Sequence, residues 1–139
     1  MMNTLEYPTQ NEIENILKES KTIAVVGLSE DPSRTSYQVS KVMQNAGYKI
    51  IPVNPKATEV LGEKAAASLQ EINEPIDIIN VFRRSEHLPG VAKEAAETNA
   101  DVFWAQLGLE NEEAYHIAKD AGLTVIMDKC IKVEHAKTM

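Results

Sequence analysis

Five stretches of apolar and β-branched residues, each about the length of a β-strand, recur along the chain. They are Thr22–Val26, Lys49–Val53, Asp77–Phe82, Val102–Leu107 and Leu123–Met127. Hydrophobicity within them is nearly continuous rather than alternating, which is typical of strands covered on both faces. We therefore expect a parallel sheet with a layer of helices on each face.

Helical patterns occupy the intervals between these stretches. Thr9 and Glu12 form a capping box, in which a hydroxyl and a carboxylate satisfy free amides of the first turn, and a short amphipathic pattern follows. Thr35 and Gln38 form a second capping box ahead of apolar residues at helical spacing, and Gly47 ends that pattern. The sequence therefore predicts one helix before the first strand and one after it.

Two further helices are predicted in the second half of the chain. One follows Ser85 as its cap and tolerates Pro89 because that residue falls in the first turn. The other opens at Asn111 and closes at Gly122. The segment from Ala57 to Pro75 is ambiguous, since its pattern fits either a short helix or an irregular crossover.

Regular alternation of strands and helices is typical of a doubly wound sheet. We expect a three-layer α/β, Rossmann-like fold with a five-stranded parallel sheet, formed by residues 1–139 as a single domain. With the five strands numbered along the chain, the sheet order that we assume is 3-2-1-4-5.

The charge balance narrows the possible partners. Fourteen basic and twenty-one acidic residues give a net charge of −7, which disfavours binding to nucleic acid or to an anionic membrane. The apolar stretches are too short to cross a bilayer, and the first ten residues do not have the pattern of a signal peptide. We therefore expect a cytoplasmic protein.

Metal-binding and disulfide patterns are missing from the sequence. Cys130 is the single cysteine, and the three histidines are scattered at positions 87, 116 and 135. We expect neither a structural metal nor an internal disulfide.

Candidate ligand-binding residues follow the first strand, because ligands of doubly wound sheets lie at the carboxyl ends of the strands. Gly27 permits close approach of the backbone, and the helix start that follows favours an anion. Gly27 alone is equally consistent with a tight turn. Ser29 and Pro32 stand where a dinucleotide fingerprint would have its second and third glycines. The loop therefore indicates a phosphorylated ligand other than a typical dinucleotide.

The second strand ends in Val53-Asn54-Pro55-Lys56, without the acidic residue that binds a ribose hydroxyl in NAD sites. A base in place of an acid favours a ribose that carries a phosphate. Arg34 and Lys56 are the candidate phosphate partners. Each taken singly is better explained as a solvated surface charge, but their joint placement after the first two strands favours a role in binding.

The next two strand ends supply further candidates. Phe82 could stack on a base or pack in the core, and Arg83 and Arg84 could bind phosphate or pair with nearby acids. Gln106 and Gly108 either contact the ligand or form the turn into the last predicted helix.

Taken in order, these strand ends resemble the CoA-binding domain family, which includes small stand-alone proteins and the N-terminal domain of succinyl-CoA synthetase alpha subunits. The segments that carry the resemblance are Ala24–Ser29, Ile51–Pro55, Asp77–Ser85, Trp104–Gly108 and Met127–Cys130. No single motif is decisive, but the ordered set is specific and spans nearly the whole chain.

The resemblance implies coenzyme A as the ligand, with its diphosphate on the Gly27–Ser36 loop and its adenosine end near Val53–Lys56. The 3′-phosphate of CoA agrees with the base at the second strand end. The resulting candidate site consists of Gly27, Leu28, Ser29, Arg34, Ser36, Val53, Asn54, Pro55, Lys56, Val81, Phe82, Arg83 and Gln106. The synthetase performs its phosphate chemistry in a further domain, so binding of CoA or acyl-CoA without catalysis is expected.

Three alternatives stay open. The chain could be an enzyme that acts on a CoA thioester or another nucleotide-linked substrate, with Cys130, Asp128 or His135 contributing. It could be a sensor of an NAD-like ligand, or an interaction module without a ligand.

Cys130 is explained either as a small buried side chain or as a thiol that exchanges with the thiol of CoA. The apolar faces of the first and last predicted helices make a homodimer possible.

Overall fold

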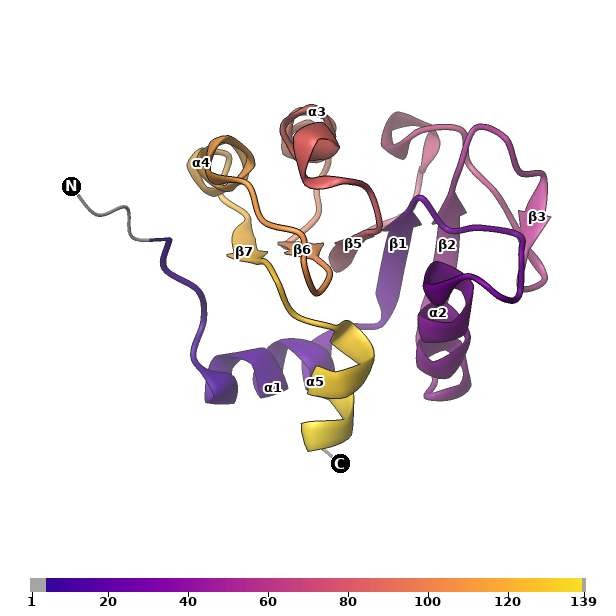
Figure 1. Cartoon of the computed structure of the whole chain (residues 1–139), viewed down its shortest axis with the longest axis horizontal. Coiled ribbons are helices and arrows are strands. Elements are labelled where there is room, and N and C mark those ends of the chain that lie inside the picture. The colour runs from indigo at the N-terminus through magenta and orange to yellow at the C-terminus, as the bar shows by residue number, and fades with distance from the viewer. Residues whose placement is uncertain (1–4, 139) are drawn as a thin grey trace.

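A computed structural model describes residues 5–138. Its centre is a five-stranded parallel sheet (Figure 1). The strands are β1 (Thr22–Val26), β2 (Lys49–Val53), β5 (Ile78–Val81), β6 (Val102–Ala105) and β7 (Thr124–Ile126). The expected α/β fold with a five-stranded parallel sheet is confirmed, and the predicted bounds of β1 and β2 match those of the structure.

The order of the strands differs from the one assumed. It is β2-β1-β5-β6-β7, so the third strand of this sheet lies beside the first and not beside the second. Pro52 gives a physical reason, because proline has no N–H and its carbonyl points away from β1, where it accepts from the N–H of Ala66. The outer edge of β2 therefore suits a sheet margin, and the chain crosses over to pair β5 with the free edge of β1.

Helices cover both faces of the sheet, which gives three layers (Figure 1). One face carries α3 (Leu88–Ala96) and α4 (Glu112–Asp120), which pack against each other. The other carries α1 (Gln10–Glu19), α2 (Thr35–Asn45) and α5 (Ile131–Thr138). Successive side chains of a strand point to opposite faces, so Phe103 belongs to the first core and Trp104 to the second.

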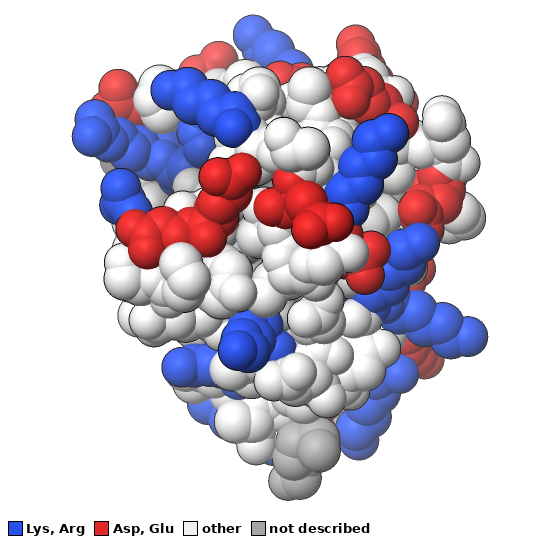
Figure 2. Space-filling model, turned by 90° about the vertical axis from the view of Figure 1, so that its right-hand side faces the viewer, with Lys and Arg blue, Asp and Glu red and all other residues white. Residues whose placement is uncertain are grey.

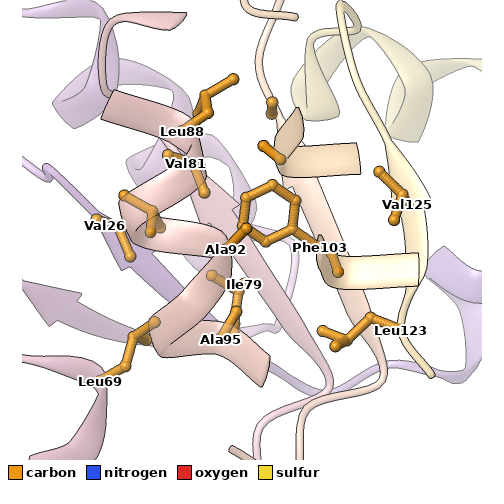
Figure 3. Packing of buried hydrophobic residues seen from close by; sticks show 14 of the residues in the cluster. Val26, Leu69, Ile79, Val81, Leu88, Ala92, Ala95, Phe103, Leu123 and Val125 are labelled. Atoms are coloured by element: carbon orange, nitrogen blue, oxygen red, sulfur yellow. The ribbon is translucent and has the colours of Figure 1, made fainter. Parts of the chain in front are cut away.

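The core beneath α3 and α4 is centred on Phe103, which is 0% exposed. Figure 3 shows its ring surrounded by side chains from the sheet and from α3, including Ile79, Val81 and Ala92. Alanines on α3 let that helix approach the sheet closely, and the large ring fills the space between them. This packing holds the carboxyl ends of the central strands at fixed positions.

The helix starts were predicted with mixed success. The Thr9–Glu12 capping box is confirmed, since both of its hydrogen bonds are present. The second capping box is wrong: α2 begins at Thr35 itself, and Gln38 donates its amide to the carbonyl of Pro32 at 3.3 Å. Ser85 does not cap α3 either, because a 3-10 turn intervenes and the Ser85 hydroxyl accepts from the N–H of Glu110.

The ambiguous segment, for which a short helix or an irregular crossover was expected, contains a small antiparallel hairpin of β3 (Glu59–Val60) and β4 (Glu63–Lys64), followed by a 3-10 turn at Leu69–Glu71. The hairpin was not predicted. Nor was α5, which packs against α1 and α2. Its pattern is not amphipathic, because Glu134 is buried while Val133 is exposed.

The faces that suggested a homodimer are occupied within the chain. Ile13 and Leu17 of α1 are each 1% exposed in the second core, and Ala114 and Ala118 of α4 lie in the first. Those two faces are therefore not available to a second copy. Seen from the side of β3 and α2, acidic and basic side chains are interspersed (Figure 2). Among residues 5–138, no helix has the length and apolar character needed to cross a bilayer.

Candidate functional site

The register of the sheet brings the predicted loops together. Val26 pairs with Val53 on one side and with Val81 on the other, and Val81 in turn pairs with Ala105. Four strands therefore end at the same level. The residues that follow them form one continuous edge, as the position of ligand sites in doubly wound sheets requires.

Gly27 is held between two of these strand ends. Its N–H donates to the carbonyl of Val53 at 2.9 Å, and its φ is +87°. A Cβ at this position would lie 2.6 Å from the carbonyl oxygen of Phe82 and 3.2 Å from Cδ of Arg83. Glycine is required here by both the backbone conformation and the space. The Gly27 backbone therefore lies at the centre of the strand ends with no side chain covering it.

Hydrogen bonds within the first loop determine its shape. The N–H of Ser29 donates to the hydroxyl oxygen of Ser36 at 3.0 Å, so these two predicted residues are joined to each other. Asp31 accepts from the N–H and the hydroxyl of Ser33, and these bonds, chiefly the backbone one, lower the pKa of Asp31 below its usual value. The Leu28 side chain is buried, so only its backbone faces the loop.

Asn54 joins the ends of β1 and β2. Its Nδ2 donates to the carbonyl of Leu28 at 2.9 Å, and its Oδ1 accepts from the N–H of Lys56 at 2.9 Å. The first bond fixes the loop after β1, and the second turns the chain so that Lys56 follows directly at the rim. Asn54 therefore positions this part of the site.

Two hollows flank Gly27. The first, which we term the β1–β2 cavity, has a volume of about 470 Å³. Its lining residues are Val26, Gly27, Val53, Asn54, Pro55, Lys56, Ala67, Ser68, Arg83, Val91 and Glu94. Six of these were predicted as site residues. Ala67, Ser68 and Glu94 were not, because they come from the crossover and from α3, where no motif marks them.

The second hollow, which we term the β5–β6 cavity, has a volume of about 460 Å³. Its lining residues are Thr35, Phe82, Arg83, Arg84, Gln106, Leu107, Leu109 and Cys130. Arg83 borders both cavities, and its side chain passes close to Gly27. Arg83 therefore stands at the junction of the two cavities.

Gln106 connects three elements beneath the β5–β6 cavity. Its Nε2 donates to Oδ1 of Asn80 at 2.5 Å, and its Oε1 accepts from the N–H of Ile131, the first residue of α5, at 3.4 Å. Both Asn80 and Gln106 are buried. Gln106 therefore has two roles: it lines the cavity, and its hydrogen bonds connect β5, β6 and α5.

Of the remaining predicted residues, Val81 is buried in the core, and Arg34 lies exposed at the start of α2. Leu28, Ser29, Arg34, Ser36 and Val81 border neither cavity. Ser29 and Ser36 shape the loop that lies beside the two cavities.

All three arginines of this net-acidic chain, Arg34, Arg83 and Arg84, lie on these strand-end loops. In the described part of the chain none of the three forms an ion pair with a carboxylate. Unpaired guanidinium groups beside bare backbone are suited to phosphate oxygens. The donor set and the space over Gly27 therefore fit a phosphorylated ligand.

Among the described residues, no hydrogen bond joins the side chains of the three residues considered for catalysis. Cys130 is half-buried at the β5–β6 cavity, and Oδ1 of Asp128 accepts from the N–H of Gly108. The His135 ring packs edge-on against Tyr48, with centroids 5.6 Å apart. Within residues 5–138, no cluster of three or more potential metal-binding side chains is found.

Comparison with known proteins extends this picture. Residues 21–136 match the model of the family described as CoA binding domain. The chain is 65% identical over 134 residues to the uncharacterized protein YneT of Bacillus subtilis (strain 168), a match that covers 96% of this chain and 99% of YneT. It is also similar to the alpha subunit of ADP-forming acetate–CoA ligase II from Pyrococcus furiosus, with 29% identity over 80% of this chain and 27% of the subunit.

Solved structures show the same fold. A hypothetical protein from Pyrococcus horikoshii OT3 has a TM-score of 0.91 and 33% identity, with 99% of both chains covered. A Thermus thermophilus protein has a TM-score of 0.91 and 36% identity, over 95% of this chain and all of the other. The segment that matches the family model, residues 21–136, spans all five strands of the sheet and every loop of the candidate site. The chain therefore belongs to the CoA-binding domain family.

Proposed function

We propose that the protein binds coenzyme A or an acyl-CoA across the carboxyl ends of its sheet, as a carrier, sensor or regulatory module without catalysis of its own. Membership of the CoA-binding domain family supports the ligand class. The chain spans only 27% of the acetate–CoA ligase subunit that it resembles, so the activity of that larger protein is not transferred.

The observation that carries the proposal is the position of Arg83 between two cavities. CoA has a charged diphosphate in its middle, a nucleotide at one end and an uncharged pantetheine arm at the other. A cation at the junction, beside the half-buried backbone of Gly27, suits the diphosphate. The β1–β2 cavity would then hold the adenosine part, and the β5–β6 cavity would hold the pantetheine arm.

The nucleotide end supports CoA over NAD. The β1–β2 cavity contains Lys56 at the end of β2, where NAD domains place an acid for the ribose hydroxyl. Lys56 forms no ion pair among the described residues. An unpaired ammonium group at this position favours the additional 3′-phosphate of CoA.

Calorimetry with CoA, dephospho-CoA and NAD tests the proposal. CoA should bind most tightly, and Lys56→Gln should reduce its advantage over dephospho-CoA by about tenfold, which corresponds to about 1.4 kcal/mol. Lys41→Gln is the matched control, because this exposed lysine lies on α2 and lines neither cavity. Equal or absent binding of CoA relative to the other two compounds would refute the proposal.

An enzyme acting on a CoA thioester is the second candidate, and the place of Cys130 on the β5–β6 cavity favours it. His135, another residue considered for such an enzyme, packs edge-on against Tyr48. Turnover of a panel of thioesters that is lost in Cys130→Ser would establish this alternative.

A further inference from the structure

We propose that Cys130 captures CoA covalently at the β5–β6 cavity. Its thiol exchanges with a disulfide that contains CoA, and a mixed disulfide between the protein and CoA forms. This inference rests on the proposed function, since it needs CoA in the site. It adds a redox-dependent mode of binding at the thiol end of the ligand.

The first argument is the place of Cys130. It is the single cysteine of the chain, it is half-buried, and it lines the cavity that would hold the pantetheine arm. The backbone on each side of it is held in place. The carbonyl of Lys129 accepts from the indole N–H of Trp104 at 2.9 Å, and the N–H of Ile131 donates to Oε1 of Gln106 at 3.4 Å. The sulfur therefore belongs to a fixed part of the cavity wall.

The second argument is a buried amide group that lacks a partner. Asn80 is 1% exposed, and its Oδ1 accepts from Nε2 of Gln106 at 2.5 Å. No acceptor for the Nδ2 of Asn80 is found among residues 5–138. A buried donor without an acceptor is unfavourable, so this group points to a polar atom that a ligand supplies.

The unpartnered amide and the thiol share one cavity. In the described part of the chain, the fully enclosed side-chain atoms without a partner are Oγ of Ser40 and Oε1 of Glu134. The Nδ2 of Asn80 is not one of them, so it reaches open space. Gln106, which bonds to Asn80, lines the β5–β6 cavity and also accepts from the residue that follows Cys130. The free donor therefore faces the same cavity as the sulfur.

The end of the pantetheine arm matches this pair of groups. It consists of an amide, two methylene groups and the sulfur. The amide carbonyl can accept from Nδ2 of Asn80, and Phe82 and Leu109 on the cavity wall suit the methylene groups. A ligand held in this way would carry its sulfur to the wall that contains Cys130.

The reaction is thiol–disulfide exchange. The Cys130 thiolate attacks the CoA sulfur of a disulfide R–S–S–CoA. The bond between the two original sulfurs breaks, the Cys130–S–S–CoA bond forms, and R–S⁻ leaves and takes up the proton that Cys130 lost. Cys130 is oxidised and the sulfur of R is reduced, so the disulfide is itself the oxidant. A reducing thiol reverses the reaction, and CoA then remains bound by non-covalent contacts alone.

Intact-protein mass spectrometry with the symmetrical disulfide of CoA tests the inference. The protein should gain the mass of one CoA less two hydrogens, dithiothreitol should remove this increment, and Cys130→Ser should not acquire it. At equal low concentrations, CoA disulfide should react at least about tenfold faster than oxidised glutathione, because the site holds the reacting sulfur beside Cys130.

Two variants test whether the site guides the reaction. Lys56→Gln changes the nucleotide end, and Asn80→Asp keeps an acceptor for Gln106 but has no N–H to donate. Each should slow the reaction with CoA disulfide and leave that with oxidised glutathione nearly unchanged, whereas Lys41→Gln should change neither rate. The ratio of the two rates is the decisive measurement, because a general change in structure would alter both rates together.

The outcomes separate the two proposals. If calorimetry under reducing conditions shows CoA binding but CoA disulfide produces no mass increment, the covalent inference is wrong and the proposed function stands. If CoA disulfide and oxidised glutathione react equally fast, Cys130 is an ordinary accessible thiol and the covalent inference is again wrong. If CoA neither binds in calorimetry nor reacts faster than glutathione as its disulfide, both proposals are wrong.

Discussion

Gly27 and Phe82 approach so closely that a Cβ on the glycine would lie 2.6 Å from the carbonyl oxygen of the phenylalanine. The two residues follow β1 and β5, which are adjacent in the sheet, and the N–H of Phe82 donates to the carbonyl of Val26 at 2.9 Å. Any side chain at position 27 would push the strand ends apart at the point where the cavities meet.

Gly27→Ala should therefore destabilise the protein more than the left-handed backbone alone explains, and it should abolish CoA binding. Gly47→Ala is the matched control, because Gly47 also has a positive φ, +109°, but its Cβ would meet nothing within 4 Å. We expect the control to cost about 1–2 kcal/mol, the usual penalty for a left-handed residue. If denaturant unfolding shows the same loss of unfolding free energy in Gly27→Ala and Gly47→Ala, the close approach of Gly27 to Phe82 has no energetic effect.

Asn54→Ala should weaken both the loop and the ligand site. The variant removes the bond to the carbonyl of Leu28 and the bond from the N–H of Lys56. We expect a loss of about 1–2 kcal/mol in the free energy of unfolding and a lower affinity for CoA.

Asn54→Asp provides the sharper comparison at the same position. It keeps an acceptor for Lys56 but sets a carboxylate against the carbonyl oxygen of Leu28 and beside the expected 3′-phosphate. CoA affinity should fall below that of Asn54→Ala, while dephospho-CoA is affected less. If calorimetry shows that Asn54→Asp loses less CoA affinity than Asn54→Ala, the result contradicts this account.

Trp104→Phe should loosen the segment that carries Cys130. The indole Nε1 of Trp104 donates to the carbonyl of Lys129 at 2.9 Å, and the ring is fully buried. Loss of the bond should cost about 1–3 kcal/mol because a carbonyl is left without its partner, and the Cys130 thiol should react faster with a soluble thiol reagent. Phe103→Leu, which alters the core on the other face of the sheet, is the control. It should reduce stability without the same acceleration.

The hydrogen bonds of the loop after β1 should affect how the free energy of unfolding depends on pH in the acidic range. Because bonds from Ser33 lower the pKa of Asp31 in the folded state, ionised Asp31 stabilises the protein above the unfolded pKa of about 3.9. That contribution is lost as pH falls through the lower folded pKa. The difference in unfolding free energy between the native protein and Asp31→Ala should accordingly shrink over this range. An Asp31 carboxyl that titrates by NMR at or above its usual pKa would contradict the geometry.

Local patterns were enough to predict most of the elements. The bounds of β1 and β2 matched because continuous apolar segments buried on both faces end where polar loop residues begin. Asn111 was correctly placed at the start of α4, where its Oδ1 accepts from the N–H of Ala114. By contrast, α5 was missed because the buried Glu134 interrupts the apolar pattern on which helix prediction depends.

The sequence by itself determined the fold class and the loops that form the candidate site, because burial, capping and glycine turns are properties of neighbouring residues. The order of the strands and the meeting of Gly27 with Phe82 were decided only in the tertiary structure. So was the place of Arg83 between two cavities. These features depend on the crossover from β2 to β5, which joins segments far apart in the chain through packing and strand pairing. Pro52 marks the outer edge of β2 as a margin of the sheet, but the residues that meet after the crossover are set by tertiary packing.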